Sequence, residues 1–228
     1  MPKVIGISGS ERLKGNTEQF IQRALDVISD YGIETELITL ADKKIKGGCT
    51  GCIWCRANRA ECCIKDDFMP IWNKMYEADG IIVGSPVYWG SATAKLKAVL
   101  ERAGTVSEGR ELGNVDGPVK DLGWPYDEKP PGLFYHKVGG AIATTRRTGA
   151  NATLAELLMW FMINNFVVVG SSYWTMGVGT KRVAKDTKSG KPGSTHTTTM
   201  LETDVEGAVT IKHFGENFAW VVNNLHGK

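Results

Sequence analysis

The chain of 228 residues lacks cysteine outside one short window, has only four histidines and carries no long run of one charge. Its 27 basic and 25 acidic residues leave a net charge of +2, which argues against nucleic acid or an anionic membrane surface as partner. The longest apolar stretch, Leu154 to Val169, is interrupted by Glu156, Asn164 and Asn165 and is too polar to span a bilayer. Because no apolar signal segment is visible either, we expect a cytoplasmic protein.

The cysteines are the first feature that is present. All five lie between residues 49 and 63, at the spacing C-x2-C-x2-C-x6-C-C: Cys49, Cys52, Cys55, Cys62 and Cys63. Two intervals of two residues let three thiolates converge from one tight loop, and Cys62 or Cys63 can supply the fourth ligand of a [4Fe-4S] cluster. The spacing therefore predicts redox chemistry.

The cysteines allow three other interpretations. Structural zinc usually takes two separated cysteine pairs or cysteines with histidines, and the histidines lie far downstream, at His136, His196, His213 and His226. Disulfides are disfavoured by the odd number of cysteines and the absent signal segment. Reduced thiols without metal are the stronger alternative, and the spacing leaves cluster and bare thiols open.

Short β-rich runs alternate with helical patterns along the chain. The expected strands are Lys3 to Ser8, Glu34 to Leu40, Gly80 to Ser85, Val138 to Thr144 and Phe166 to Gly170. The expected helices are one from Thr17, then Phe68 to Glu77 behind Asp66 and Asp67 as N-cap candidates, Ala92 to Arg102, Ala150 to Asn164 and Lys212 to Asn224. The alternation predicts one α/β domain over residues 1–228, with a five-stranded parallel sheet covered by helices on both faces.

Three long segments interrupt this pattern. A cysteine-cluster loop covers residues 42–66, and a long insertion covers residues 104–135. The insertion carries Trp124, Tyr126, Phe134 and Tyr135, which fit a lid over a bound ligand or an oligomerisation arm equally well. Residues 176–209 form a third long segment, and loops of this length in a compact domain are usually functional or mobile.

Ligands of parallel sheets bind beyond the carboxyl ends of the strands, which directs attention to the loops after the first, third and fourth strands. The first loop, residues 8–17, combines hydroxyls, glycines and Arg12 just before a helix N-terminus, where a phosphate is favoured. It matches neither the dinucleotide nor the P-loop pattern, so a monophosphate fits better. An ordinary polar turn capped by Asn16 or Thr17 is the alternative.

The other two loops offer aromatic rings and arginines. In residues 85–93, Tyr88 and Trp89 follow a buried strand and can hold a flat heterocycle, or else belong to the core or a subunit contact. In residues 144–151, hydroxyls can bond a ring edge, while Arg146 and Arg147 can pair with a phosphate or an anionic cofactor, or else are solvated surface charges.

Taken together, the motifs GISGS-x-R-x3-NT, SPVYWGS and TTRRTGANATL resemble those of the flavodoxin-like NAD(P)H-dependent FMN reductases. With the compact cysteine motif followed by IKDDF, the chain is most similar to the iron–sulfur flavoprotein branch of that family. The resemblance covers almost the whole chain and implies a doubly wound sheet of strand order 2-1-3-4-5. It departs in the third loop, where many relatives carry glycines followed by Gln-Glu instead of Arg146 and Arg147.

The resemblance also implies cofactors and site residues. The FMN phosphate would be surrounded by Ser8, Ser10, Arg12, Asn16 and Thr17. The isoalloxazine ring would be lined by Pro86, Val87, Tyr88, Trp89 and Gly90, with Thr145, Arg146 and Gly149 on its far side. A [4Fe-4S] cluster would be held by Cys49, Cys52, Cys55 and Cys62, with Cys63 as the alternative fourth ligand. A homodimer or homotetramer is implied as well.

Three functions follow as hypotheses. The first is an FMN-dependent oxidoreductase that passes electrons between a [4Fe-4S] cluster, FMN and a ferredoxin-like carrier or small-molecule acceptor. The second is a cluster-free flavin or quinone reductase with NAD(P)H as substrate. The third is a non-enzymatic binding protein on a flavodoxin-like scaffold, since a fold does not fix a function. No residue stands out as a conventional catalytic acid or base.

Overall fold

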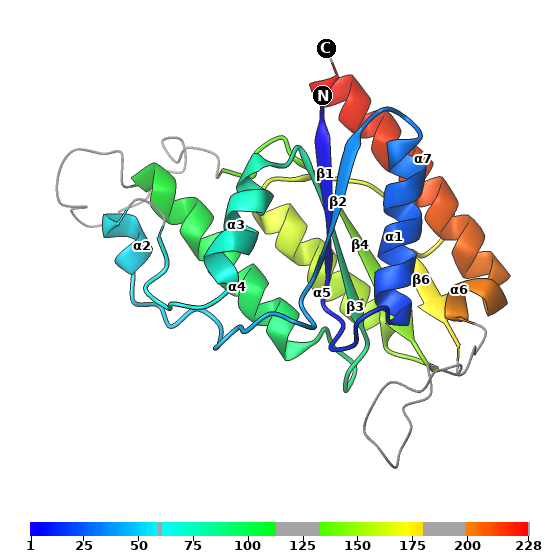
Figure 1. Ribbon diagram of the computed structural model, residues 1–228, viewed down its shortest axis with the longest axis horizontal. Coiled ribbons are helices and arrows are strands. Elements are labelled where there is room, and N and C mark those ends of the chain that lie inside the picture. The colour runs from blue at the N-terminus through cyan, green and yellow to red at the C-terminus, as the bar shows by residue number, and fades with distance from the viewer. Residues whose placement is uncertain (59–60, 113–132, 180–198, 228) are drawn as a thin grey trace.

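A parallel sheet forms the centre of this computed structural model, which describes residues 1–58, 61–112, 133–179 and 199–227 (Figure 1). The main strands are β1 (Lys3–Ser8), β2 (Glu34–Thr39), β3 (Gly80–Pro86), β4 (Val138–Thr145) and β5 (Val167–Val168). Their order is β2-β1-β3-β4-β5, and each neighbouring pair is parallel. The predicted α/β class and strand order are confirmed.

The outer edge of β4 is covered by two short strands instead of one. β5 pairs with the first residues of β4, and β6 (Met176–Val178) pairs in parallel with its last residues. Because β3 occupies the other side of β4, both short strands lie on the same edge. The expected strand over residues 166–170 is therefore too long, and β6 was not expected. The chain leaves the sheet after Val169 and returns at Thr175, whose carbonyl accepts from the Ala143 N–H at 3.0 Å.

Helices cover both faces of the sheet, as predicted. One face carries α1 (Asn16–Ser29) and α7 (Val205–His226), and the other carries α3 (Phe68–Glu77), α4 (Ala94–Leu112) and α5 (Ala150–Ile163) (Figure 1). Alternate residues of β1 serve the two cores: Val4 packs on the α1 side, while Ile5 and Ile7 pack on the other. This two-sided burial explains why the strands read as continuous apolar runs.

Several helix boundaries differ from the predicted ones. Helix α4 continues past Arg102 to Leu112, because Gly104 does not end it but packs against α5, where an added Cβ would lie 3.5 Å from the Asn164 side chain. Helix α7 begins seven residues earlier than predicted, at Val205, with Asp204 accepting from the Gly207 N–H. The short helices α2 (Trp54–Ala57) and α6 (Met200–Thr203) were not expected.

Parts of the predicted long segments lie outside the described residues. These are residues 113–132 of the first insertion, with Trp124 and Tyr126, and residues 180–198 of the second. Phe134, at the end of the first insertion, is fully buried and packs edge-on against Trp72 and Trp160, whereas Tyr135 is exposed. Among the helices that the structure describes, none combines the length and apolar character needed to cross a bilayer.

Candidate functional site

The loops after β1, β3 and β4 meet at the carboxyl end of the sheet, as the topology predicts. The Gly9 N–H donates to the Gly84 carbonyl at 2.7 Å, and the Val87 N–H donates to the Thr144 carbonyl at 2.9 Å. The Thr17 and Thr144 hydroxyls, both buried, are hydrogen-bonded at 2.5 Å. These contacts join loop 8–17, loop 85–93 and loop 144–151 into one surface.

The hydroxyls of the first loop organise its own backbone. The buried Ser10 hydroxyl donates to the Arg12 carbonyl and accepts from the Arg12 N–H, both at 3.1 Å. The Ser8 hydroxyl accepts from the Ser10 N–H at 3.4 Å. The Asn16 side chain accepts from the Met200 N–H at 3.3 Å and so ties α1 to α6. Arg12 itself is exposed.

The N-terminus of α1 opens onto the same end of the sheet. Its N-cap is Gly15, and no side chain of the described residues caps it. The first-turn N–H groups of a helix lack intrahelical partners, and the helix dipole places partial positive charge there. A phosphate group therefore fits this end, beside the loop that carries Arg12.

Loop 85–93 presents a tight turn whose tip is exposed. Trp89 has φ +53° and Gly90 φ +82°, the left-handed pair that makes a type I′ turn. Tyr88 and Ser91 close the turn through two backbone hydrogen bonds of 2.9 and 3.1 Å. The turn leaves the Trp89 indole fully exposed, although a left-handed tryptophan is strained.

Two side chains from neighbouring helices hold this turn. The Glu156 carboxylate of α5 accepts from the Ser91 hydroxyl at 2.8 Å and from the Ala92 N–H at 3.0 Å. Lys97 of α4 donates to the same hydroxyl at 3.1 Å. The turn is thus fixed by partly buried contacts below its exposed tip.

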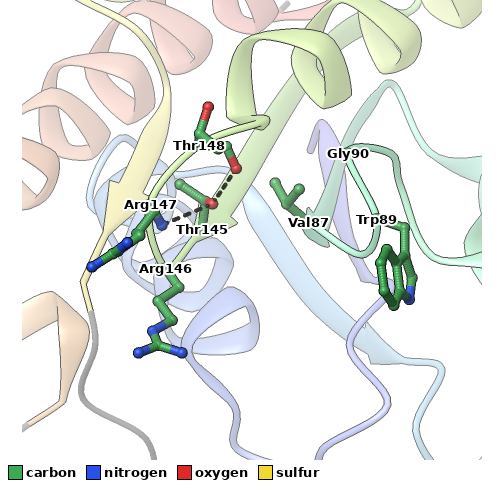
Figure 2. A pocket seen from close by; sticks show the side chains of 7 residues that line it. All are labelled: Val87, Trp89, Gly90, Thr145, Arg146, Arg147 and Thr148. Carbon is green, nitrogen blue, oxygen red and sulfur yellow. Dashed lines mark hydrogen bonds between the residues drawn. The ribbon is translucent and has the colours of Figure 1, made fainter.

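An open hollow of about 370 Å³ lies between the second and third loops (Figure 2). Its lining consists of Val87, Trp89, Gly90, Thr145, Arg146, Arg147 and Thr148. Trp89 stands on one side and the two arginines on the other, with Val87 and Thr145 between them (Figure 2). The Thr145 hydroxyl donates to the Thr148 carbonyl at 2.7 Å and so shapes the third loop. An aromatic wall opposite cationic side chains suits a flat, polar-edged ring.

The predicted flavin residues are divided by this arrangement. Val87, Trp89, Gly90, Thr145 and Arg146 line the hollow. Pro86, Tyr88 and Gly149 support its loops, and an added Cβ on Gly149 would lie 2.9 Å from Val87 Cγ1. The phosphate-loop residues Ser8, Ser10, Arg12, Asn16 and Thr17 lie at the same end of the sheet but are not among the residues that line the hollow.

The five cysteines surround a second, smaller cavity. All of them line it, together with Arg102, Thr105 and Val106 of α4. Cys55 is buried and donates to the Thr105 carbonyl at 3.7 Å, Cys62 is half-buried, and Cys49, Cys52 and Cys63 are exposed. The fold therefore brings together every thiol that the spacing singled out.

The thiols differ in their electrostatic surroundings. The Trp54 backbone N–H and the Cys63 thiol lower the pKa of Cys52, whose sulfur lies 3.4 Å from that of Cys63. The neighbouring Cys52 thiolate raises the pKa of Cys63, and burial raises the pKa of Cys55. The thiol of Cys52 therefore ionises more readily than those of Cys55 and Cys63.

The cavity is suited in donor chemistry to a metal group that takes several thiolates. Among the described side chains, no three cysteine, histidine, aspartate or glutamate groups converge on a single-ion site. A [4Fe-4S] cluster instead takes four thiolates spread around it. The cavity is about 20 Å³, room for little more than a water molecule, so the exposed thiols must move outward to admit a cluster.

A buried ion pair lies beside the cysteine cavity, and the sequence pattern did not predict it. Arg102, 1% exposed, makes two hydrogen bonds to Asp66, of 2.7 and 2.9 Å. Of the two predicted N-cap candidates of α3, Asp67 stands at the N-cap but its side chain makes no capping bond, whereas the Asp66 carboxylate accepts from the Phe68 N–H at 3.1 Å. Asp66 and Arg102 are 36 residues apart, and no local sequence pattern predicts such a pair.

Known proteins are similar to this chain over most of its length. Residues 2–181 match the family model of the NADPH-dependent FMN reductases. An iron–sulfur flavoprotein of Methanocaldococcus jannaschii is 37% identical over 222 residues, covering 96% of this chain and 97% of that protein. One from Archaeoglobus fulgidus is 29% identical over 226 residues, covering 98% and 99%.

Among solved structures, that of RosB with a bound riboflavin-5′-phosphate derivative aligns with a TM-score of 0.65 at 16% identity, covering 100% of this chain and 82% of that one. At this identity the likeness concerns the fold alone. The family match and the relatives make the chain an FMN-binding flavin oxidoreductase. The chain belongs to the NADPH-dependent FMN reductase family, in its iron–sulfur flavoprotein branch.

Proposed function

We propose that this oxidoreductase holds FMN at the carboxyl end of the sheet and a [4Fe-4S] cluster in the cysteine cavity, and exchanges electrons with a ferredoxin-like carrier or a small-molecule acceptor. The observation that carries the proposal is the gathering of all five cysteines around one cavity. Relatives that share nearly the whole chain are named iron–sulfur flavoproteins, which supports it.

The residues at the carboxyl end divide the work of holding FMN. Arg12 and the N-terminus of α1 would bind the phosphate, since both present positive charge. Trp89 and Val87 would pack on the ring, and Thr145 and Arg146 would bond its polar edge. Because one side of the hollow is open, a small substrate such as NAD(P)H has access to this end of the molecule.

The cysteine cavity offers four ligands and a spare. Cys49, Cys52 and Cys55 would bind together with Cys62, which is half-buried and packs against the core, while Cys63 is exposed. When bound, FMN supplies two-electron chemistry and a cubane cluster supplies one-electron transfer. Helix α4 links the sites: it begins after loop 85–93, and its Arg102, Thr105 and Val106 line the cysteine cavity, about 12–18 Å further along its axis at ~1.5 Å per residue.

The decisive experiment counts cofactors in protein purified without oxygen. We expect iron and sulfide near four per chain after anaerobic reconstitution, with one FMN, and a visible spectrum that shows both chromophores, as ~4 irons define a cubane cluster. The variant Cys55→Ser should lose iron and keep FMN, whereas Cys63→Ser should keep both. Wild-type protein with FMN but without iron or sulfide would contradict the cluster.

The close Cys52 and Cys63 sulfurs and the small cavity favour a second candidate, a cluster-free NAD(P)H-dependent flavin or quinone reductase. The same purification separates the two. Iron-free protein that retains FMN and oxidises NAD(P)H with a quinone acceptor would support the second candidate and exclude the first.

A further inference from the structure

We propose that Arg102 is a positioning residue for the group bound in the cysteine cavity: it fixes both ends of the cysteine segment and supplies the charge and the hydrogen-bond donor that raise the reduction potential of that group. The inference rests on the proposed function, because it concerns the redox group of that site. It adds a residue of α4, outside the cysteine motif, to the machinery of the cavity.

The first step is the position of the guanidinium between the two ends of the cysteine segment. Arg102 donates to the Gly47 carbonyl at 3.5 Å, before the first cysteine, and to the Ile64 carbonyl at 3.2 Å, after the last. Asp66 in turn accepts from the Lys46 N–H at 2.9 Å. One side chain of α4 therefore connects the entry and the exit of the segment.

The second step is a donor that the protein leaves unused. The Nε atom of Arg102 is buried, and within the described part of the chain it has no hydrogen-bond partner. Buried donors without a partner are rare and costly, so an acceptor in the cavity that Arg102 lines would satisfy this one. A thiolate or sulfide sulfur is such an acceptor.

The third step is the pair of groups that face Arg102. Burial lowers the pKa of its guanidinium, but the neighbouring Asp66 carboxylate and Cys62 sulfur outweigh burial and raise it. The guanidinium also stacks on the Phe68 ring, with its carbon 4.1 Å from the ring centre. A planar side chain with five donors makes these contacts at once, and a lysine does not.

The consequence concerns reduction. An added electron makes the bound group more negative, and a neighbouring cation or a hydrogen bond to sulfur stabilises that state and raises the potential. Asp66 acts in the opposite sense, because its carboxylate offsets part of the charge of Arg102. Changes at the two residues should therefore shift the potential in opposite directions.

The test is a redox titration of anaerobically reconstituted protein, followed by visible and paramagnetic resonance spectra. Arg102→Gln should lower the potential by at least a tenfold change in the reduction equilibrium, which is about 59 mV for one electron. Arg102→Lys keeps the charge and should fall between that variant and the wild type. Asp66→Asn should raise the potential. A role confined to folding predicts no such opposite shifts.

Arg56→Gln is the matched control. Arg56 follows Cys55 directly and also has a buried Nε, but it does not line the cavity, so Arg56→Gln should shift the potential by less than Arg102→Gln does. If Arg102→Gln loses iron but keeps FMN, and Arg102→Lys restores iron, the fixing of the segment is supported. Equal potentials in wild type, Arg102→Gln and Arg102→Lys would overturn the inference, as would shifts of one sign at Arg102 and Asp66.

Failure of the inference differs from failure of the proposed function. If the wild-type protein takes up no iron and sulfide, the proposed cluster is excluded and the proposed function fails with it. Wild-type protein that takes up the cluster, with Arg102 variants of unchanged potential and iron content, leaves the function in place and removes the role of Arg102.

Discussion

At the scale of single residues, most polar side chains of the first loop hold the loop itself in place, whereas Arg12 is exposed. The Ser8 and Ser10 hydroxyls make hydrogen bonds to the loop backbone, and the Thr17 hydroxyl is hydrogen-bonded to that of Thr144. Arg12 is exposed beside the N-terminus of α1. A phosphate at this position would meet a guanidinium and backbone N–H groups more readily than serine hydroxyls.

Arg12→Ala should therefore weaken FMN binding. Hydrogen bonds to charged groups contribute about 1.5–3 kcal/mol, which is a loss of at least about tenfold in affinity. Riboflavin, which lacks the phosphate, should bind wild type and variant equally. Isothermal titration of apoprotein with both flavins measures this. An unchanged FMN affinity would show that loop 8–17 does not hold the phosphate.

A second residue-scale prediction concerns acid stability. Hydrogen bonds from Lys74 and, at 3.3 Å, from Lys3 lower the pKa of Glu36 below its ordinary 4.5. A carboxyl with a lowered native pKa stabilises the fold above its unfolded pKa, and this contribution is lost as the pH falls from 4.5 through the native value. Over that pH range, the Glu36→Gln variant should lose less free energy of unfolding than the wild type loses. The difference should be below about 1 kcal/mol, because the ion pair is partly exposed. Urea unfolding at neutral and acid pH tests this, and parallel curves would contradict it.

The sequence allowed the cysteines to be identified, because their spacing is a local pattern. The motifs at the strand ends likewise placed Val87, Trp89 and Thr145 beside one hollow. Arg102 and Asp66 could not be found in this way: their partnership depends on how α4 packs against the cysteine segment, and neither residue is unusual in its own surroundings. The support of the Trp89 turn by Glu156, 65 residues from Ser91, was hidden for the same reason.

At the scale of elements, the second and third loops depend on a close approach at Gly149. Its φ of +91° is left-handed, and an added Cβ would lie 2.9 Å from Val87 Cγ1 and 3.3 Å from Gly90 Cα. A larger residue must both strain its own backbone and push the Trp89 turn. The shape of the hollow is thus set where two loops touch.

Gly149→Ala should cost more than the ~1–2 kcal/mol of a left-handed alanine and should weaken FMN binding. Gly32→Ala is the control, since Gly32 has φ +75° but open space around its Cα. It should lose a similar strain energy and keep FMN affinity. Urea unfolding and flavin titration give both quantities. Equal flavin affinity in the two variants would argue against a role of Gly149 in shaping the hollow.

Most elements could be predicted because buried parallel strands and amphipathic helices have distinct periodicities. The edge strand beside β4 was mispredicted because it is broken in two. β5 pairs with the first residues of β4, β6 pairs with its last residues, and the chain leaves the sheet between them. The length of α4 was underestimated because Gly104, a helix breaker by propensity, provides room for α5 instead. In both cases tertiary packing overrode the local signal.

At the scale of the whole molecule, one face combines exposed apolar side chains from neighbouring elements. Met159, Met162 and Ile163 of α5 are 61%, 61% and 80% exposed, and Val168 of β5, whose side chain alternates onto the α5 side of the sheet, is 37% exposed. Such clusters mark interaction surfaces more often than isolated apolar residues do. We propose that this face, here termed the α5 face, associates with a second copy of the chain.

Ile163→Lys should weaken self-association by at least about tenfold in dissociation constant, since a charge would be buried in the contact. Leu225→Lys, at an exposed position on α7, is the control and should associate like the wild type. Sedimentation velocity over a concentration series measures the effect. A monomeric wild type, or an Ile163 variant that associates normally, would contradict the role of the α5 face.

The fixed ends of the cysteine segment have a further consequence, for the order of assembly. Asp66 and Asp67 bond the backbone of Lys46 and Lys44, and Arg102 bonds both ends, so the loop between them is already closed in the protein alone. Closing a loop costs conformational entropy, and here packing and the buried ion pair meet that cost in advance. A small zinc domain, by contrast, folds only when its metal binds. This chain should therefore fold first, and the proposed cluster should enter the cysteine cavity afterwards, as a late and separable step of maturation.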